Sequence, residues 1–154
     1  MAPWTPEKGN YEVRTYEPDD FKFFASMDME LAIGKPTHEL AKLYQNNGPS
    51  ITALYKGEPF AMAGLNIMWT GTAEAWALFA PGFSKHGVFI HRTAIRMLNI
   101  WAIDHKLKRI QAAADQNHEA ACVWLDALGF NYEAPMPYYF NNRTFIRFAK
   151  LFLG

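Results

Sequence analysis

The chain has little of the features that mark secreted or membrane proteins. Its 154 residues include one cysteine, Cys122, which cannot form an internal disulfide, so we expect a reducing, intracellular setting. No apolar run reaches the roughly 20 residues of a membrane-spanning helix, because Asp, Lys, Arg or His interrupts each candidate. The first ten residues carry Glu7, Lys8 and two prolines, unlike a signal peptide. These absences predict a cytoplasmic protein that does not associate with a membrane.

The chain also lacks an excess of either charge. Fifteen Lys and Arg residues balance fifteen Asp and Glu residues, and the nearest approach to a basic block is the loose set Lys106, Lys108 and Arg109. Binding driven by phosphate neutralisation needs a basic surface, so the balance argues against a nucleic-acid partner. No repeat or linker-like stretch interrupts the sequence, and half of it is apolar. We therefore expect residues 1–154 to form a single domain with a substantial core.

Aromatic residues are plentiful, and the first half of the chain is predicted to be rich in strands. Tyr11 to Tyr16 alternates as a strand does. An Asp after Pro18 can cap a helix that includes Phe21, Phe23, Phe24 and Met27, and a second helix fits Thr37 to Gln45. Short turns at Lys56-Gly57-Glu58 and Thr70-Gly71 predict antiparallel hairpins. They join three expected strands, Ser50–Tyr55, Pro59–Trp69 and Thr72–Phe79.

Helical spacing returns in the second half of the chain. One helix is predicted from Gly87 to about Lys106, and another after Asn117, the expected N-cap, as far as Gly129. The remaining strands are expected at Arg109–Ala114, Phe130–Glu133 and Thr144–Lys150. A strand–helix–strand unit over residues 72–114 requires a right-handed crossover, which places parallel strands in the middle of the sheet. The predicted class is α+β, or mixed α/β.

Residues 79–89 join the end of a strand to the start of a long helix. The segment reads Phe-Ala-Pro-Gly-Phe-Ser-Lys-His-Gly-Val-Phe. It resembles the pyrophosphate loop of the GNAT superfamily of N-acetyltransferases, with Pro81 and Gly87 at matching positions. Ser84 stands where Arg or Gln is usual, and Phe89 replaces a small residue.

Residues 115–130 carry a second motif, an Asn followed by a helix that ends in Leu-Gly-Phe. It resembles the corresponding part of the same superfamily. Leu125 occupies the position where many of these enzymes have a Tyr that protonates the CoA thiolate. The Trp-Leu pair at 124–125 is similar to GNAT-like proteins of tailed bacteriophages, which implies a phage source and a location in the host cytoplasm or the virion.

The resemblance implies a fold and a cofactor. The fold is a mixed, mostly antiparallel sheet of about six to seven strands with a splayed parallel pair, flanked by about four helices. The cofactor is acetyl-CoA, because loop N–H groups and the positive end of a helix suit a pyrophosphate. Side chains of Lys85 and His86 are expected to add phosphate contacts. The implied cofactor-binding residues are Leu78, Phe79, Ala80, Ser84, Lys85, His86, Gly87, Val88, Phe89 and Asn117.

Acyl transfer to an amine needs a group that accepts a proton and a group that donates one. Glu74, on the strand before the loop, is either this base or a solvated strand residue. His118, near the expected amine site, is either catalytic or a surface residue. Tyr138, together with Tyr139, supplies the proton that Leu125 cannot, lines a substrate pocket, or packs as a strand aromatic. No His or Cys pattern has the spacing of a metal site.

Two functions follow as expectations. The first is an acetyl-CoA-dependent N-acetyltransferase that acts on an amine of a protein, including a host protein, or of a small molecule, by direct attack in a ternary complex. The alternative is a catalytically inactive GNAT scaffold that serves as a phage structural or host-takeover binding protein, which the departures at Ser84, Phe89 and Leu125 suggest. An apolar group is expected to cover the acceptor site or to form a homodimer or partner surface: Phe21, Phe23, Phe24, Met27 and Met29.

Overall fold

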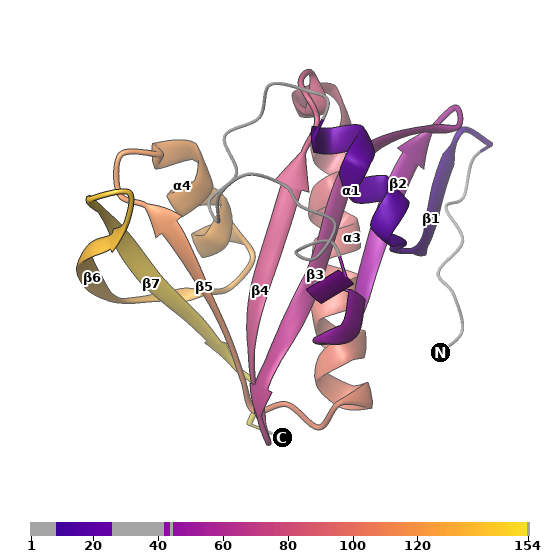
Figure 1. The fold of residues 1–154 in the computed structure, drawn as a ribbon. Coiled ribbons are helices and arrows are strands. Elements are labelled where there is room, and N and C mark those ends of the chain that lie inside the picture. Colours follow the sequence, from indigo (N-terminus) through magenta and orange to yellow (C-terminus); the bar gives the residue numbers. More distant parts are fainter. Residues whose placement is uncertain (1–8, 26–41, 44, 154) are drawn as a thin grey trace. The chain divides into compact units, whose positions relative to one another are not determined.

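The computed structural model describes residues 9–25, 42–43 and 45–153 (Figure 1). Its strands are β1 (Tyr11–Thr15), β2 (Ser50–Tyr55), β3 (Glu58–Trp69), β4 (Thr72–Phe79), β5 (Arg109–Asp115), β6 (Asn131–Phe140) and β7 (Arg143–Leu151). Its helices are α1 (Pro18–Ala25), α3 (Gly87–Asp104) and α4 (Glu119–Ala127), with a short 3₁₀ helix η1 (Phe83–His86) before α3. None of the helices in this part of the chain has the length and apolar character needed to cross a membrane.

The strands form one sheet in the order β1-β2-β3-β4-β5-β7-β6. Pairing is parallel between β4 and β5, where Thr72–Glu74 face Arg109–Gln111. It is antiparallel for β1 with β2, β2 with β3, β5 with β7 and β6 with β7. The predicted fold class, a mixed and mostly antiparallel sheet with one parallel pair and flanking helices, is confirmed.

The chain divides into two compact units. The first contains Met1–Asn66 and Trp76–Ile90, and the second contains Ile67–Ala75 and His91–Gly154. Met27, Met29 and most of the predicted helix Thr37–Gln45 lie outside the described residues, as do the side chains of Phe23 and Phe24.

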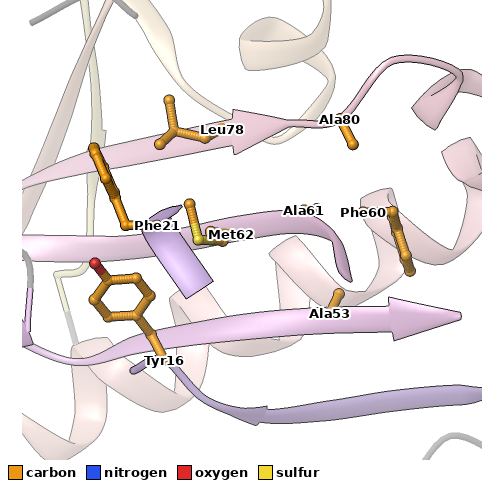
Figure 2. Close-up of a cluster of buried hydrophobic side chains, with 8 residues drawn as sticks. All are labelled: Tyr16, Phe21, Ala53, Phe60, Ala61, Met62, Leu78 and Ala80. Carbon is orange, nitrogen blue, oxygen red and sulfur yellow. The ribbon is translucent and has the colours of Figure 1, made fainter. Parts of the chain in front are cut away.

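The core of the first unit gathers side chains from α1 and from four strands and their flanks (Figure 2). Phe21 reaches it from α1 and is 2% exposed, so this residue belongs to the core and not to the surface covering that the sequence suggested. Figure 2 shows Phe21 close to Met62 and Tyr16, with Phe60 further along the sheet. The buried members of the cluster are Tyr16, Phe21, Ala53, Phe60, Ala61, Met62, Leu78 and Ala80.

Asp20 fixes the start of α1. Its carboxylate accepts two hydrogen bonds of 2.7 Å from Arg14 and one of 2.8 Å from the buried Thr52 hydroxyl. It also accepts the backbone N–H of Glu17 at 2.9 Å, which satisfies one of the free donors at a helix N-terminus. Pro18 at the first helical position needs no such partner. Burial alone would raise the pKa of Asp20, but these hydrogen bonds hold it below its usual value.

The second unit is built around β5 and β7. Ile110, Ala112 and Ala114 alternate as buried residues of β5, which lies where the sequence predicted a strand. The later half of α3 contributes further buried residues, Met97, Leu98, Trp101 and Ala102. Strand β6 lies at the edge of the sheet and is mostly exposed.

Two predicted boundaries are wrong. Strand β6 continues to Phe140, seven residues beyond the predicted end at Glu133, so Tyr138 and Tyr139 lie in a strand and not in a loop. Pro135 and Pro137 lie within this strand, and an edge strand tolerates proline because its outer N–H groups need no partner. The N-cap of α4 is His118 and not Asn117, since Nδ1 of His118 accepts the Ala121 N–H at 3.1 Å.

Candidate cofactor and catalytic site

The predicted pyrophosphate loop folds as a turn, a 3₁₀ helix and the first turn of α3, all within the first unit. The turn places Gly82 at φ 80°, a left-handed conformation that glycine adopts without strain. Ser84, Lys85, Gly87 and Val88 are exposed. The N–H of Gly87 donates to the Ser84 carbonyl within the loop. The exposed surface of the loop contains the start of α3 and the side chain of Lys85.

Gly87 has space around it. Its φ of −56° suits any residue, and a Cβ built on it would meet nothing within 4 Å. Neither backbone strain nor crowding by the protein therefore requires glycine here. A ligand that approaches the backbone closely is a physical reason for the absent side chain, and the anion-binding tendency of a helix N-terminus fits a phosphate.

His86 and Phe89 turn into the unit rather than toward solvent. The imidazole of His86 is 6% exposed, and its Nδ1 lies 2.8 Å from the Tyr11 hydroxyl. The ring of Phe89 stacks on Tyr11 with centroids 4.0 Å apart. Burial and then the charge of Lys85 lower the pKa of His86, so the ring is mainly neutral at pH 7. Such a ring does not suit the side-chain phosphate contact expected of His86, which leaves Lys85 as the cationic residue of the loop.

The three strand residues predicted to contact pantetheine differ in what they offer. Leu78 and Ala80 are buried, and the N–H of Ala80 donates to the Phe60 carbonyl at 2.9 Å. Successive residues of a strand direct their backbone groups to opposite edges. The backbone groups of Phe79 therefore face the edge of β4 opposite to Phe60.

In the second unit, Glu74 is neither a solvated strand residue nor a free carboxylate. Arg147, in the middle of β7, donates a short hydrogen bond to its Oε1 atom. The guanidinium also lies 5.7 Å from the centroid of the Tyr139 ring. Burial alone would lower the pKa of Arg147, but its hydrogen bonds with Glu74 and Tyr139 leave that pKa raised. Glu74, Arg147 and Tyr139 thus form a connected polar group.

The residues after β5 form a second polar group in this unit. Asp115 accepts the backbone N–H of Asn117 at 2.9 Å and pairs with Arg143 at 3.0 Å. Because Nδ1 of His118 accepts the Ala121 N–H, a neutral His118 carries its proton on Nε2. His118 is therefore arranged to donate a hydrogen bond through Nε2 rather than to accept a proton there.

Tyr138 is 81% exposed and has φ 55°, a conformation that bulky residues rarely adopt. It lies at an irregularity of β6 between Met136 and Phe140. Leu125 is half-buried on α4. The thiol of Cys122 has its pKa raised by burial and then by the charges of Asp115 and Glu119, so it is not an activated nucleophile.

The predicted site residues divide between the two units. All of the predicted cofactor-binding residues except Asn117 belong to the first unit, and Asn117 belongs to the second with Glu74, His118 and Tyr138. Among the described residues, no three His, Cys, Asp or Glu side chains gather as a metal site would require.

Sequence reasoning did not assign a role to Arg147 or Tyr11. A signal for Arg147 was present, because it is the one charge within the run Phe145–Ala149, and a charge among apolar residues requires a partner. Tyr11 offered no comparable signal, since its contacts with the loop connect residues 75 or more positions apart.

No family model matches the chain, and no curated protein matches it in sequence. Solved structures do match its fold. A chimera of the spermidine N-acetyltransferase SpeG from Vibrio cholerae and hSSAT gives a TM-score of 0.74 at 19% identity, over 93% of this chain and 96% of that one. A probable acetyltransferase gives 0.76 at 16% identity over 94% of each chain. A dodecameric SpeG from Vibrio cholerae gives 0.68 at 18% identity, over 92% and 94%.

These similarities define the class of fold. Each covers more than nine-tenths of both chains, and each structure is described as an acetyltransferase. The chain therefore has the GNAT fold that its sequence predicted. At these identities the likeness concerns the fold, and the activity is argued from the site.

Proposed function

We propose that the chain is an acetyl-CoA-dependent N-acetyltransferase. The observation that carries the proposal is the exposed loop after β4, where Gly87 opens α3 with unfilled space at its Cβ position. A diphosphate fits there because the helix N-terminus and the exposed Lys85 favour an anion. We assign the loop backbone from Ser84 to Phe89, with the Lys85 side chain, to this group.

The backbone of Phe79 is proposed to pair with the pantetheine amides, as an added strand pairs with a sheet edge. Leu78 and Ala80 support this strand through their burial, and Asn117 is proposed to approach the pantetheine arm. Acetyl-CoA supplies a thioester that an amine can attack directly. The chain's own residues then have to orient the two substrates and move two protons.

Glu74 is proposed as the group that receives the proton of the attacking ammonium. Arg147 binds its Oε1, so we assign Oε2 to the amine or to a bridging water. His118 is proposed to orient the acceptor through its Nε2–H. Tyr138 is proposed as the proton donor to the departing thiolate, since Leu125 has no proton to give.

Binding and turnover test the proposal separately. Titration calorimetry with acetyl-CoA should show one site per chain, and a panel of amines that includes polyamines, lysine peptides and small metabolites should release free CoA thiol. Spermidine belongs in the panel because structures of similar fold are spermidine N-acetyltransferases. Absence of acetyl-CoA binding at high micromolar ligand would rule the enzyme out.

A GNAT scaffold without catalysis, in a phage structural or host-takeover role, is the second candidate. Two observations favour it, namely Leu125 at the usual acid position and the ion pair that already engages Glu74. Tight CoA binding together with no acetylated product from any amine, peptide or cell lysate would select this candidate. Product formation that requires Glu74 would select the enzyme.

A further inference from the structure

Tyr11 of β1 contacts the loop on both sides of Gly87. Its hydroxyl lies 2.8 Å from Nδ1 of His86, the residue just before the glycine. Its ring stacks on Phe89, two residues after the glycine, with the planes only 8° apart. The Tyr11 side chain thus contacts a residue on each side of Gly87, within the backbone segment that we assign to the diphosphate.

The hydrogen bond is partly shielded from water. The rings of Tyr55 and Phe60 lie 4.8 Å and 4.3 Å from the His86 imidazole, which is 6% exposed. A tyrosine hydroxyl both donates and accepts, so the bond forms with either neutral tautomer of the histidine. Loss of the hydroxyl would leave a buried nitrogen without a partner, and water is poorly placed to replace it.

The contacts of Phe89 explain why a large side chain occupies this position. A large side chain at this position could block the approach of a ligand to the loop backbone. Here its ring contacts Tyr11, with centroids 4.0 Å apart, and Phe60, with centroids 6.0 Å apart. The phenylalanine therefore anchors the first turn of α3 to β1 rather than covering the loop.

Binding by backbone N–H groups depends on the fixed geometry of the backbone that carries them. We infer that Tyr11 is a positioning residue for the acetyl-CoA diphosphate, because it holds His86 and Phe89 so that the backbone between them faces the ligand. This inference rests on the proposed function. Tyr11 contacts the loop and not the reacting atoms, so it is not a catalytic residue.

The test compares Tyr11→Phe with Tyr55→Phe. Tyr11→Phe keeps the ring on Phe89 and removes only the hydroxyl that pairs with His86. Tyr55→Phe is the matched control, since it removes a hydroxyl from a neighbouring ring of the same cluster. We expect Tyr11→Phe to raise the Kd and KM for acetyl-CoA about five- to tenfold with little change in kcat, and Tyr55→Phe to change neither.

S-acetylpantetheine, which lacks the diphosphate, distinguishes positioning from general stability. Its kcat/KM should be the same for the wild type and Tyr11→Phe. Equal losses with both acyl donors, or no loss with acetyl-CoA, would overturn the positioning role. A wild type that does not bind acetyl-CoA would instead overturn the proposed function itself.

His86→Phe provides a second route to the same interaction. If the two side chains act through their hydrogen bond, the double variant with Tyr11→Phe should bind acetyl-CoA no more weakly than the weaker single variant. Fully additive losses would mean that the residues act independently, which contradicts the inference. Far-UV circular dichroism and thermal unfolding would verify that each variant is folded.

Discussion

The two compact units hold their candidate site residues by different forces. In the first unit, the loop around Gly87 is fixed by a hydrogen bond between neutral groups and by ring contacts of Tyr11, His86 and Phe89. In the second, Glu74 is held by a charged guanidinium that also lies near the Tyr139 ring. Two further ion pairs, Arg109–Glu133 and Arg143–Asp115, occur in the second unit.

The neutral contacts around the loop of the first unit suit the negative charge of the proposed diphosphate ligand. A loop that binds a polyanion benefits from neutral anchors, because they add no negative charge beside the phosphates and do not weaken with salt. In the second unit, the carboxylate of Glu74 is instead paired with the charge of Arg147. Asp20 is an exception in the first unit, since its carboxylate is buried and paired with Arg14. The comparison can be tested by removing these groups one at a time.

The largest expected effect is on stability, from Asp20→Ala in the first unit. The change leaves the Thr52 hydroxyl, the Glu17 N–H and the Arg14 guanidinium without their shared acceptor, and should lower the free energy of unfolding by about 3 kcal/mol. Urea unfolding measures it. The control is Asp19→Ala in the same helical turn, which is exposed and should cost about 0.5 kcal/mol. Equal losses from both variants would contradict the role of Asp20.

In the second unit, Arg147→Met should lower the free energy of unfolding by about 2 kcal/mol. The reason is that it leaves the partly buried Glu74 carboxylate without its counter-charge. Arg143→Met is the matched control. Its side chain is 58% exposed, against 15% for Arg147, and without it Asp115 still accepts the N–H of Asn117, so its loss should stay below about 1 kcal/mol. If the two arginine variants were equally stable, the ion pair with Glu74 would not be structural.

Lowering the pH should test the Asp20 carboxylate through a smaller change in the free energy of unfolding. The folded-state pKa of Asp20 is lowered from 3.8, so its contribution to stability is complete above that value and is lost as the pH falls through the folded pKa. Asp20→Asn has no such carboxylate. The difference in unfolding free energy between wild type and Asp20→Asn should therefore be constant from pH 7 to about pH 5 and shrink below about pH 4. A difference that does not change with pH would show that the pKa of Asp20 is the same in the folded and unfolded protein, which contradicts the role of its hydrogen bonds.

Gly87→Ala should have the smallest effect on stability and a clear effect on binding. Its φ is helical and its Cβ would meet no atom, so we expect an unfolding free energy within about 0.5 kcal/mol of the wild type or slightly higher. The added methyl group should nevertheless weaken acetyl-CoA binding, measured by calorimetry, because it occupies space assigned to the diphosphate. Unchanged affinity would place the diphosphate elsewhere.

Gly82→Ala is the control for Gly87→Ala. Gly82 has φ 80°, so this variant should lose about 1 kcal/mol of stability. The two glycines are five residues apart in one loop, but only one of them is required by the backbone itself. The two variants together distinguish a glycine that folding requires from a glycine that the proposed ligand requires.

Local sequence signals predicted most of the elements. The hairpin turn at Lys56 and Gly57 has positive φ at both residues, as the short connection required. The boundaries of β2 and β4 agree with the predicted strands, and β5 begins at the predicted residue Arg109. These features depend on neighbouring residues, so a single sequence is enough to predict them.

The prediction of β6 failed because it depended on the neighbours of the strand in the sheet. Proline is unfavourable in a central strand and tolerated at an edge, and only the strand order β5-β7-β6 shows that this strand is the outermost. The sequence did not predict the orientation of the His86 and Phe89 side chains for the same reason. Whether these side chains face a ligand or the core depends on Tyr11, which is 75 residues away from His86 in the chain.

The sequence by itself determined the strand and helix pattern and the glycine-containing loop, because these follow from local spacing and turn chemistry. The resemblance of its element order and two motifs to a known family predicted the GNAT fold. Only the tertiary structure decided the partners of the site residues, namely Arg147 for Glu74 and Tyr11 for His86. The physical reason is that a charge or ring acquires its environment from segments distant in the chain, and a linear pattern contains no distances between them.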